Sequence, residues 1–336
     1  MEIGCSVIVP MFNEEEVIEH TYHRLKQVMD CVEEGYEIIF VNDGSRDRTA
    51  QIVEAICLKD PHVKLIQFSR NFGHQVAISA GMDYASGRCI VIIDADLQDP
   101  PELILEMLSK WREGYEVVYG KRIKRKGESV FKKMTALLFY RLLGRMTKVD
   151  IPLDTGDFRL IDRKVCDVLK SLKEKNRFVR GLVGWVGFRQ TSVEYVRDER
   201  FAGVTKYPLR KMISFALDGI TSFSHKPLKI ASYIGVMLSL SSFIYLFVVL
   251  LQKWFELGTV PGWASIVAIN LFFNGIVLML LGVMGEYIGR IYDESKDRPL
   301  YIVREITNFQ REGANPAAQP PYVADGVREQ VGEYAG

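Results

Sequence analysis

The chain has no excess of one charge and no cysteine pattern. Its 43 lysine and arginine residues against 42 aspartate and glutamate residues give a net charge of +1, so no global attraction to nucleic acid is expected. The 5 cysteines are scattered and none belongs to a CxxC pair, which argues against a zinc site and against a disulfide framework. Unpaired thiols of this kind fit a reducing compartment.

Two nucleotide-binding signatures are also missing. No GxGxxG follows an apolar run, which argues against a dinucleotide site, and no GxxxxGK[ST] occurs, which excludes a P-loop. The segment 1–16 lacks the basic start and the long apolar core of a secretory signal. We therefore expect the N-terminal part of the chain to stay in the cytoplasm.

Short apolar runs alternate with helical patterns over residues 1–120. The runs are "CSVIVP" (5–10), "EIIFVND" (37–43), "KLIQFS" (64–69) and "CIVIID" (89–94). Such nearly continuous apolar runs are typical of parallel strands that are buried on both faces. Their alternation with helices predicts an α/β fold. Asn13, followed by Glu16, predicts a capping box before the helical pattern of Ile18 to Met29.

A polar cluster follows each predicted strand. The clusters are "PMFNE" (10–14), "NDGS" (42–45), "SRNFG" (69–73) and "DADLQD" (94–99). Ligand sites of α/β sheets lie at the carboxyl ends of the strands, so these clusters predict one site at one edge. His74 opens a helix beside this edge and is a candidate for substrate contact.

Asp94 and Asp96 stand one residue apart at the end of the fourth predicted strand. Two such carboxylates can share a hard cation, Mg²⁺ or Mn²⁺, which also holds substrate phosphates, and Gln98 adds a neutral oxygen. The alternative is a turn that caps a helix, because aspartates are common there. The neighbouring polar clusters favour a metal site over a capping turn.

Two uncharged stretches, 230–251 and 261–285, are long enough to cross a bilayer. We expect a hairpin of two transmembrane helices at about 230–251 and 263–285; the alternative is a pair of buried core helices. Basic residues precede the first stretch and follow the second, and the loop between them holds only Lys253, so both termini are expected in the cytoplasm.

Three further segments have distinct compositions. Residues 121–150 are rich in basic side chains with apolar positions at helical spacing, which predicts a helix on an anionic membrane; a solvated charged face is the alternative. On that helix, Lys132 and Lys133 could attract a lipid phosphate. A second amphipathic segment covers 205–227, and the polar tail 310–336 is expected to be disordered.

Five motifs in order carry a family resemblance: "VIVPMFNE", "VNDGSRDRT", "SRNFGHQVAISAGMDYASG", "DADLQDPPE" and "TGDFRLID". Together with the hairpin they resemble glycosyltransferase family 2. Within it the chain is similar to the polyprenyl-phosphate glycosyltransferases, a group that includes bactoprenol glucosyltransferases and dolichol-phosphate mannose synthases. The resemblance covers roughly residues 3–305 and is much less specific for the sugar.

The resemblance implies a GT-A catalytic domain over 1–204, followed by the amphipathic segment 205–227, the two helices within 228–286, a cytoplasmic juxtamembrane segment 287–309 and the tail. It implies inverting transfer of a hexose to undecaprenyl phosphate at the bacterial inner membrane, most simply glucose from UDP-glucose, with Mg²⁺ or Mn²⁺. UDP-GlcNAc, UDP-galactose and GDP-mannose are the alternative donors. A homo-oligomer, for example a tetramer, is also implied.

The resemblance also assigns roles to single residues. The nucleotide sugar would contact Pro10, Phe12, Glu14, Val41, Asp43, Asp94 and Ala95; the metal would contact Asp94, Asp96 and Gln98; phosphates would contact Arg122, Arg200 and Lys206. Phe12 stands where the family often has tyrosine. Asp157 matches the catalytic base, although a lipid phosphate is already largely a dianion at neutral pH, so Asp157 can instead orient the acceptor.

Three rival classes can be compared with the sequence. A processive polysaccharide synthase usually carries QxxRW and more spans, and this chain has neither. A soluble dehydrogenase is excluded because the glycine motif is missing and because the chain has the apolar hairpin. A non-catalytic membrane scaffold would have lost the DxD or TGDFRL motif first, and both are intact.

Overall fold

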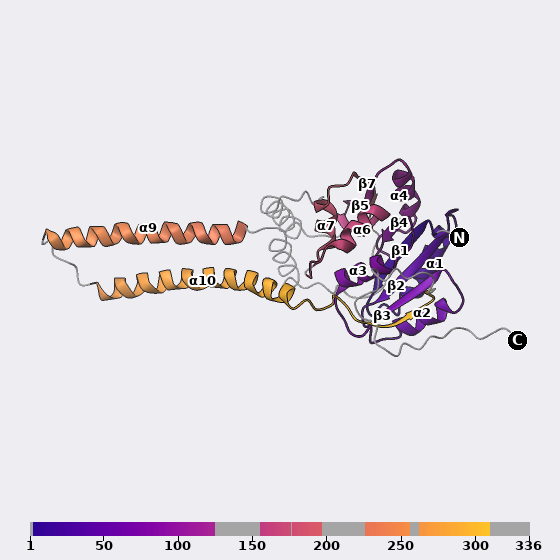
Figure 1. Ribbon diagram of the computed structural model, residues 1–336, viewed down its shortest axis with the longest axis horizontal. Helices are drawn as coiled ribbons and strands as arrows, with labels where there is room; N and C mark the ends of the chain where they lie inside the picture. Colours follow the sequence, from indigo (N-terminus) through magenta and orange to yellow (C-terminus); the bar gives the residue numbers. More distant parts are fainter. Residues whose placement is uncertain (1–2, 125–154, 176, 197–225, 256–261, 310–336) are drawn as a thin grey trace.

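The computed structural model describes residues 3–124, 155–175, 177–196, 226–255 and 262–309. These residues form an α/β domain and a hairpin of two long helices that projects from it (Figure 1). The expected α/β architecture with two C-terminal apolar helices is confirmed.

Four parallel strands form the centre of the sheet, at the positions that the sequence predicts. They are β1 (Cys5–Met11), β2 (Tyr36–Asn42), β3 (Val63–Phe68) and β4 (Cys89–Ile92). β1 lies between β2 and β4, and β2 pairs with β3. Almost all their residues are buried because helices cover both faces, which explains the nearly continuous apolar runs.

Four further strands, which the sequence pattern does not predict, extend the sheet to the order β7-β5-β6-β4-β1-β2-β3-β8. They are β5 (Val117–Lys124), β6 (Thr155–Asp162), β7 (Gln190–Val196) and β8 (Val303–Thr307). β6 is antiparallel to β4, with Ile92 opposite Arg159. The first residues of β6 therefore lie at the edge where β4 ends.

Helices pack on both faces of the sheet and create two cores. α1 (Ile18–Met29), α2 (Thr49–Cys57) and α4 (Leu103–Arg112) contribute to one core. α3 (His74–Tyr84), α6 (Arg163–Ser171) and α7 (Val179–Trp185) contribute to the other. Leu25 and Met107 are fully buried on the first face, and Ile78 and Val165 on the second.

The predicted capping box is wrong. α1 begins at Ile18, and no side chain caps its first turn. Asn13 has a positive φ of 53° and its Oδ1 accepts a hydrogen bond from Arg46 N at 2.8 Å, while Asn13 N donates to Ser45 Oγ at 3.0 Å. Asn13 thus joins the loops after β1 and β2, because tertiary partners compete with local capping.

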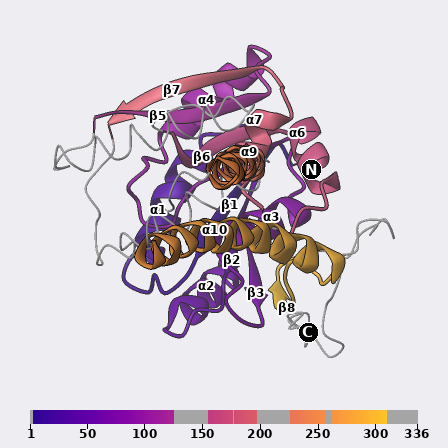
Figure 2. The same ribbon diagram turned by 90° about the vertical axis from the view of Figure 1, so that its left-hand side faces the viewer.

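The hairpin consists of α9 (Lys226–Trp254) and α10 (Trp263–Ser295), which include the predicted stretches 230–251 and 263–285. With 29 residues α9 is roughly 44 Å long, more than the hydrocarbon thickness of a bilayer. Windows at 226–245 and 272–295 have mean hydropathies of 1.4 and 1.6 and are almost entirely exposed. The helices stand in front of the domain in Figure 2 and are long and apolar enough to cross a membrane.

The chain returns to the sheet after the hairpin. Tyr301 is 1% exposed and its ring stacks on Phe68, with centroids 5.1 Å apart. β8 then pairs with β3 in antiparallel orientation. The segment 287–309, expected to be juxtamembrane, thus contains the end of α10 and an edge strand of the sheet.

Several expectations lie outside the described residues. These are most of the basic segment 121–150, all but the last two residues of the amphipathic segment 205–227, the tail 310–336 and the site candidates Lys132, Lys133, Arg200 and Lys206.

A polar cluster around Asp60 joins α1 to the loop before β3. Asp60 is 5% exposed, and its oxygens accept from Tyr22 Oη at 3.0 Å and from His62 N at 3.0 Å. Lys26 Nζ lies 2.9 Å from Asp60 Oδ2. Burial alone would raise the pKa of Asp60, but the bonds from Lys26 and His62 lower it from its ordinary 3.8 to about 2.

We predict that Asp60→Asn destabilises the domain in a pH-dependent way. Because the pKa of Asp60 is lower in the folded protein than in the unfolded chain, its ionised carboxylate stabilises the fold at pH values above 3.8. This stabilisation is lost as the pH falls from 3.8 towards 2. We therefore expect Asp60→Asn to lower the free energy of unfolding at pH 7 by about 2 kcal/mol. Thermal denaturation in detergent at pH 7 and pH 3 would measure it. An equal loss at both values would contradict the assignment.

Candidate active site

The predicted polar clusters meet at the carboxyl edge of the sheet. Pro10 on β1 pairs with Val41 on β2, and both are buried. Glu14 N donates to Thr49 Oγ1 at 2.9 Å, which fixes the loop that carries Phe12 and Glu14 beside the start of α2. The structure therefore places the candidates of the first two motifs on one edge.

Asp43 lies at the end of β2 and is 4% exposed. Its Oδ1 accepts from Phe72 N, at 2.6 Å, and its Oδ2 from Gly73 N, at 3.0 Å. Burial raises the pKa of Asp43, while these two N–H groups oppose the rise. Because Gly73 directly precedes α3, the carboxylate fixes where α3 begins.

The DxD motif follows β4 and presents two different carboxylates. Asp96 Oδ1 accepts from Gln98 N at 3.2 Å, around Leu97, which has a left-handed φ of 57°. Asp94 Oδ1 is buried and makes no hydrogen bond with a described residue. Burial and the neighbouring carboxylates raise the pKa of Asp94 to about 6, against the effect of His74, whose Nε2 lies 3.4 Å away. Ala95 O accepts from Thr21 Oγ1 at 2.7 Å, which holds the turn on α1.

The residues present fit a divalent cation that is shared with a substrate. Within the described ranges no group of three or more histidine, cysteine or acidic residues forms a complete metal cage. Asp94 and Asp96 nonetheless offer hard oxygen ligands, and the buried Oδ1 of Asp94, which lies 3.4 Å from His74 Nε2, accepts no hydrogen bond from a described residue. Mg²⁺ commonly takes one or two carboxylates together with substrate phosphates and water, so an incomplete protein ligand set suits it.

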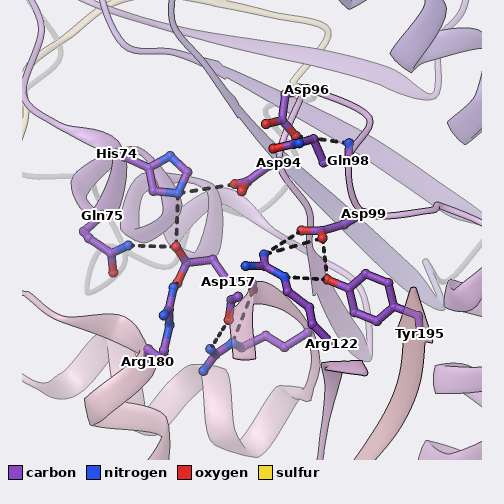
Figure 3. A network of polar contacts seen from close by, with 12 residues as sticks. His74, Gln75, Asp94, Asp96, Gln98, Asp99, Arg122, Asp157, Arg180 and Tyr195 are labelled. Atoms are coloured by element: carbon purple, nitrogen blue, oxygen red, sulfur yellow. Dashed lines mark hydrogen bonds and ion pairs between the residues drawn. The ribbon is translucent and has the colours of Figure 1, made fainter. Parts of the chain in front are cut away.

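Asp157 lies on β6 and faces the DxD motif across the edge (Figure 3). Its Oδ2 accepts from Gln75 Nε2 at 3.2 Å and lies 3.4 Å from His74 Nε2, and its Oδ1 lies 3.2 Å from Arg180 Nη2. Although burial would raise the pKa of Asp157, Arg180 and His74 hold it well below its usual range. Asp157 is consequently an anion at neutral pH and a weak base.

His74 is the cationic partner shared by two carboxylates. Burial lowers its pKa, but its contact with Asp157 and the charge of Asp94 outweigh this effect and raise the pKa to about 9. A protonated His74 links the DxD motif to Asp157. The predicted position of His74 at the start of a helix is confirmed.

Arg122 is anchored on the opposite side of the DxD turn. Its Nε donates to Tyr195 Oη at 3.1 Å, its Nη2 lies 3.5 Å from Asp99, and Tyr195 Oη donates to Asp99 (Figure 3). Asp99 is fully buried. This triad keeps a guanidinium group on the edge where the resemblance places the phosphates.

Four residues of the site have roles that the motifs do not predict. Gln75, Asp99, Arg180 and Tyr195 hold Asp157 or Arg122. Gln75 follows His74 within the motif "SRNFGHQVAISAGMDYASG", and Asp99 ends "DADLQD", so the motifs could have indicated both residues. Arg180 and Tyr195 lie on elements without a motif, and only the fold brings them to the edge.

The family match agrees with this geometry. Glycosyl transferase family 2 matches residues 6–169, which include the DxD motif and Asp157. "Uncharacterized glycosyltransferase YkcC" of Bacillus subtilis is 67% identical over 303 residues, which cover 90% of this chain and 94% of that protein. The chain belongs to glycosyltransferase family 2. It is therefore a glycosyltransferase with a GT-A fold.

A relative with a more specific name is also similar along almost its whole length. "Bactoprenol glucosyl transferase" of Shigella phage SfV is 42% identical over 299 residues, 89% of this chain and 97% of that protein. Among solved structures, S. aureus TarS 1–349 in complex with UDP-GlcNAc has a TM-score of 0.44 at 18% identity, over 66% of each chain. The two sequence relatives and the family match confirm the family resemblance.

We predict that Gly156→Ala damages the site without unfolding the domain. A Cβ at this position would lie 2.3 Å from Arg122 Nη2, so the guanidinium must move away from Asp99. If Arg122 holds a donor phosphate, the KM for the nucleotide sugar rises roughly tenfold, because one charged hydrogen bond to the phosphate is lost. Steady-state kinetics would measure the rise. Gly275→Ala, where nothing lies within 4 Å, is the matched control; an unchanged KM would count against this role for Arg122.

Proposed function

We propose that the chain transfers glucose, with inversion, from UDP-glucose to undecaprenyl phosphate at the cytoplasmic face of a bacterial inner membrane. The observation that carries the proposal is the 42% identity to a bactoprenol glucosyl transferase along 97% of that protein. The two apolar helices support a membrane-bound acceptor. The product would be a lipid-linked sugar that serves as a donor for glycans outside the membrane.

Asp94 and Asp96, with Gln98, would hold Mg²⁺ or Mn²⁺ and the diphosphate of the donor. The cation would supply charge neutralisation for the departing UDP. On the other side of the turn, the Arg122 guanidinium would bind a phosphate oxygen as its side chain is fixed by Asp99 and Tyr195. Pro10, Phe12, Glu14, Val41 and Asp43 would surround the nucleoside.

The lipid phosphate would act as the nucleophile. With a second pKa near ~6 it is mostly a dianion at pH 7, so it needs no strong base. Its oxygen forms a bond to the anomeric carbon on the face opposite the diphosphate, and the bond to the diphosphate breaks with its electron pair leaving on UDP. Asp157 would position the acceptor and the cations around it, because its low pKa makes it a poor proton acceptor.

The remaining parts of the proposal concern the membrane. Arg200, Lys206, Lys132 and Lys133 would hold phosphates of the donor or the acceptor. The basic flanks of the hairpin favour a multi-pass topology with the catalytic domain and both termini in the cytoplasm. Asn270 and Asn274 lie one turn apart on α10 and would contribute to contacts in a homo-oligomer.

A donor screen tests the reaction. Purified full-length protein in detergent is mixed with undecaprenyl phosphate, Mg²⁺ and UDP-glucose, UDP-GlcNAc, UDP-galactose or GDP-mannose, and the lipid is analysed by mass spectrometry. We expect one hexosyl-phosphate lipid, from UDP-glucose. A product from another donor would overturn the sugar assignment, and no product from any donor would favour a scaffold or another acceptor.

We predict that Asp96→Asn reduces transfer by roughly 100-fold or more while the melting temperature stays unchanged, since it removes a charged oxygen from the cation site. Calorimetric binding of UDP with and without Mg²⁺ gives a second measure, in which the variant loses the Mg²⁺-dependent part. Asp167→Asn, an exposed acidic residue of α6, is the control. Near-normal turnover of the Asp96 variant would rule out the metal assignment.

A further inference from the structure

The end of the hairpin and the segment after it contact α3 and the loop that leads into α7. α3 provides His74 and Gln75, and α7 provides Arg180. α3 itself, and the loop before α7, also contact the stretch from Glu294 to Phe309. The end of the hairpin and the site are therefore connected by two short paths.

The first path runs along α3. At its far end Asp83 Oδ2 accepts from Tyr301 Oη at 2.8 Å, and the Tyr84 ring packs edge-on against Phe309, with centroids 5.2 Å apart. At its near end Gln75 Nε2 donates to Asp157. With 11 residues α3 is only about 16 Å long, so it acts as a single rigid body.

The packing of α3 leaves it little room to adjust. A Cβ on Gly81, in the middle of the helix, would lie 2.3 Å from Ile8 Cγ2 on β1, so the helix backbone is in close contact with the sheet. Close-packed interiors transmit displacements instead of absorbing them. A shift at Asp83 is therefore expected to reach Gln75.

The second path runs through the loop between α6 and α7. Lys175 N donates to Glu294 Oε1 at 2.7 Å, and Lys175 Nζ lies 2.9 Å from Asp297 Oδ1. Five residues later, Arg180 pairs with Asp157. Asp297 has a 93% exposed side chain, and such exposed ion pairs contribute little, about 0–1 kcal/mol. The buried Tyr301 contact is the stronger of the two.

We propose that Tyr301 is a positioning residue for the transfer reaction, which acts through Asp83 and α3 to hold His74 and Gln75 against Asp157. The proposal rests on the role given to Asp157 in the proposed function. It makes the docked end of the membrane hairpin a part of the machinery that sets the geometry of the site. Attachment to the membrane and catalytic geometry are thereby coupled through one tyrosine.

The test compares three variants of the full-length protein in detergent. Tyr301→Phe removes the hydroxyl and keeps the ring on Phe68. Asp83→Asn keeps an acceptor for that hydroxyl and is the conservative variant. Tyr22→Phe removes a similar tyrosine–aspartate bond, to Asp60, which does not involve α3, and is the matched control.

Two measurements are made on each variant. The first is kcat and KM for both substrates, with rates corrected for the folded fraction. The second is amide hydrogen exchange without substrate, which compares Val76 and Ala77 at the start of α3 with α1; both amides donate to Gly73 O at 3.0 Å. The second measurement does not depend on which sugar is transferred.

We expect Tyr301→Phe to lower kcat roughly three- to tenfold with unchanged KM values, as misplaced groups reduce the rate more than the affinity. Exchange at the start of α3 should rise at least about threefold, with α1 unchanged. Asp83→Asn should keep more than half of the wild-type kcat, and Tyr22→Phe, whose bond lies on α1, should change neither kcat nor exchange at Val76 and Ala77.

Other results overturn the proposal. A kcat of Tyr301→Phe equal to that of Tyr22→Phe would do so, as would unchanged exchange at Val76 and Ala77. If the wild-type protein forms no product from any donor, the proposed function fails, and the exchange measurement alone decides whether Tyr301 positions α3.

Discussion

A carboxylate that keeps its charge inside a protein needs cations and hydrogen-bond donors around it, and Asp157 imposes this constraint on the whole site. Burying an unpaired charge destabilises the fold by several kcal/mol, far more than a single surface contact stabilises it. The partners of Asp157 come from α3 and α7, while its own strand β6 adds the buried Arg159. These three elements must therefore be placed together before the site exists.

The carboxylates at this edge differ in the partners that compensate their charge. Asp99 is compensated by Arg122 and Tyr195, and Asp157 by Arg180 and His74, so both are satisfied within the protein. Asp94 differs, because its buried Oδ1 accepts no hydrogen bond from a described residue and lies 3.4 Å from His74 Nε2, a partner that it shares with Asp157. The edge thus combines two carboxylates with partners of their own and one carboxylate whose cationic partner is shared.

The sequence predicts the centre of the fold well and its borders poorly. Strands β1 to β4 are buried on both faces, so each shows a nearly continuous apolar run, and the loops at their carboxyl ends carry recognisable motifs. β7 and β8 are partly exposed edge strands with mixed residues, so no period marks them. Arg180 and Tyr195 are ordinary residues in sequence, and only long-range packing makes them part of the site. At Asn13 a local pattern misleads: the sequence predicts that its side chain caps α1, but the side chain accepts a hydrogen bond from Arg46 N in another loop.

The position of β8 has a consequence for how the protein is made. β3 is finished within the first 68 residues, but its neighbour on the outer side is synthesised only after the hairpin, at residues 303–307. Until then β3 is an open edge with unpaired backbone groups, the kind of edge on which chains aggregate. Translation places the synthesis of α9 and α10 between these two events. The sheet is thus completed last, by a strand that can dock only when the hairpin has turned the chain back towards the domain.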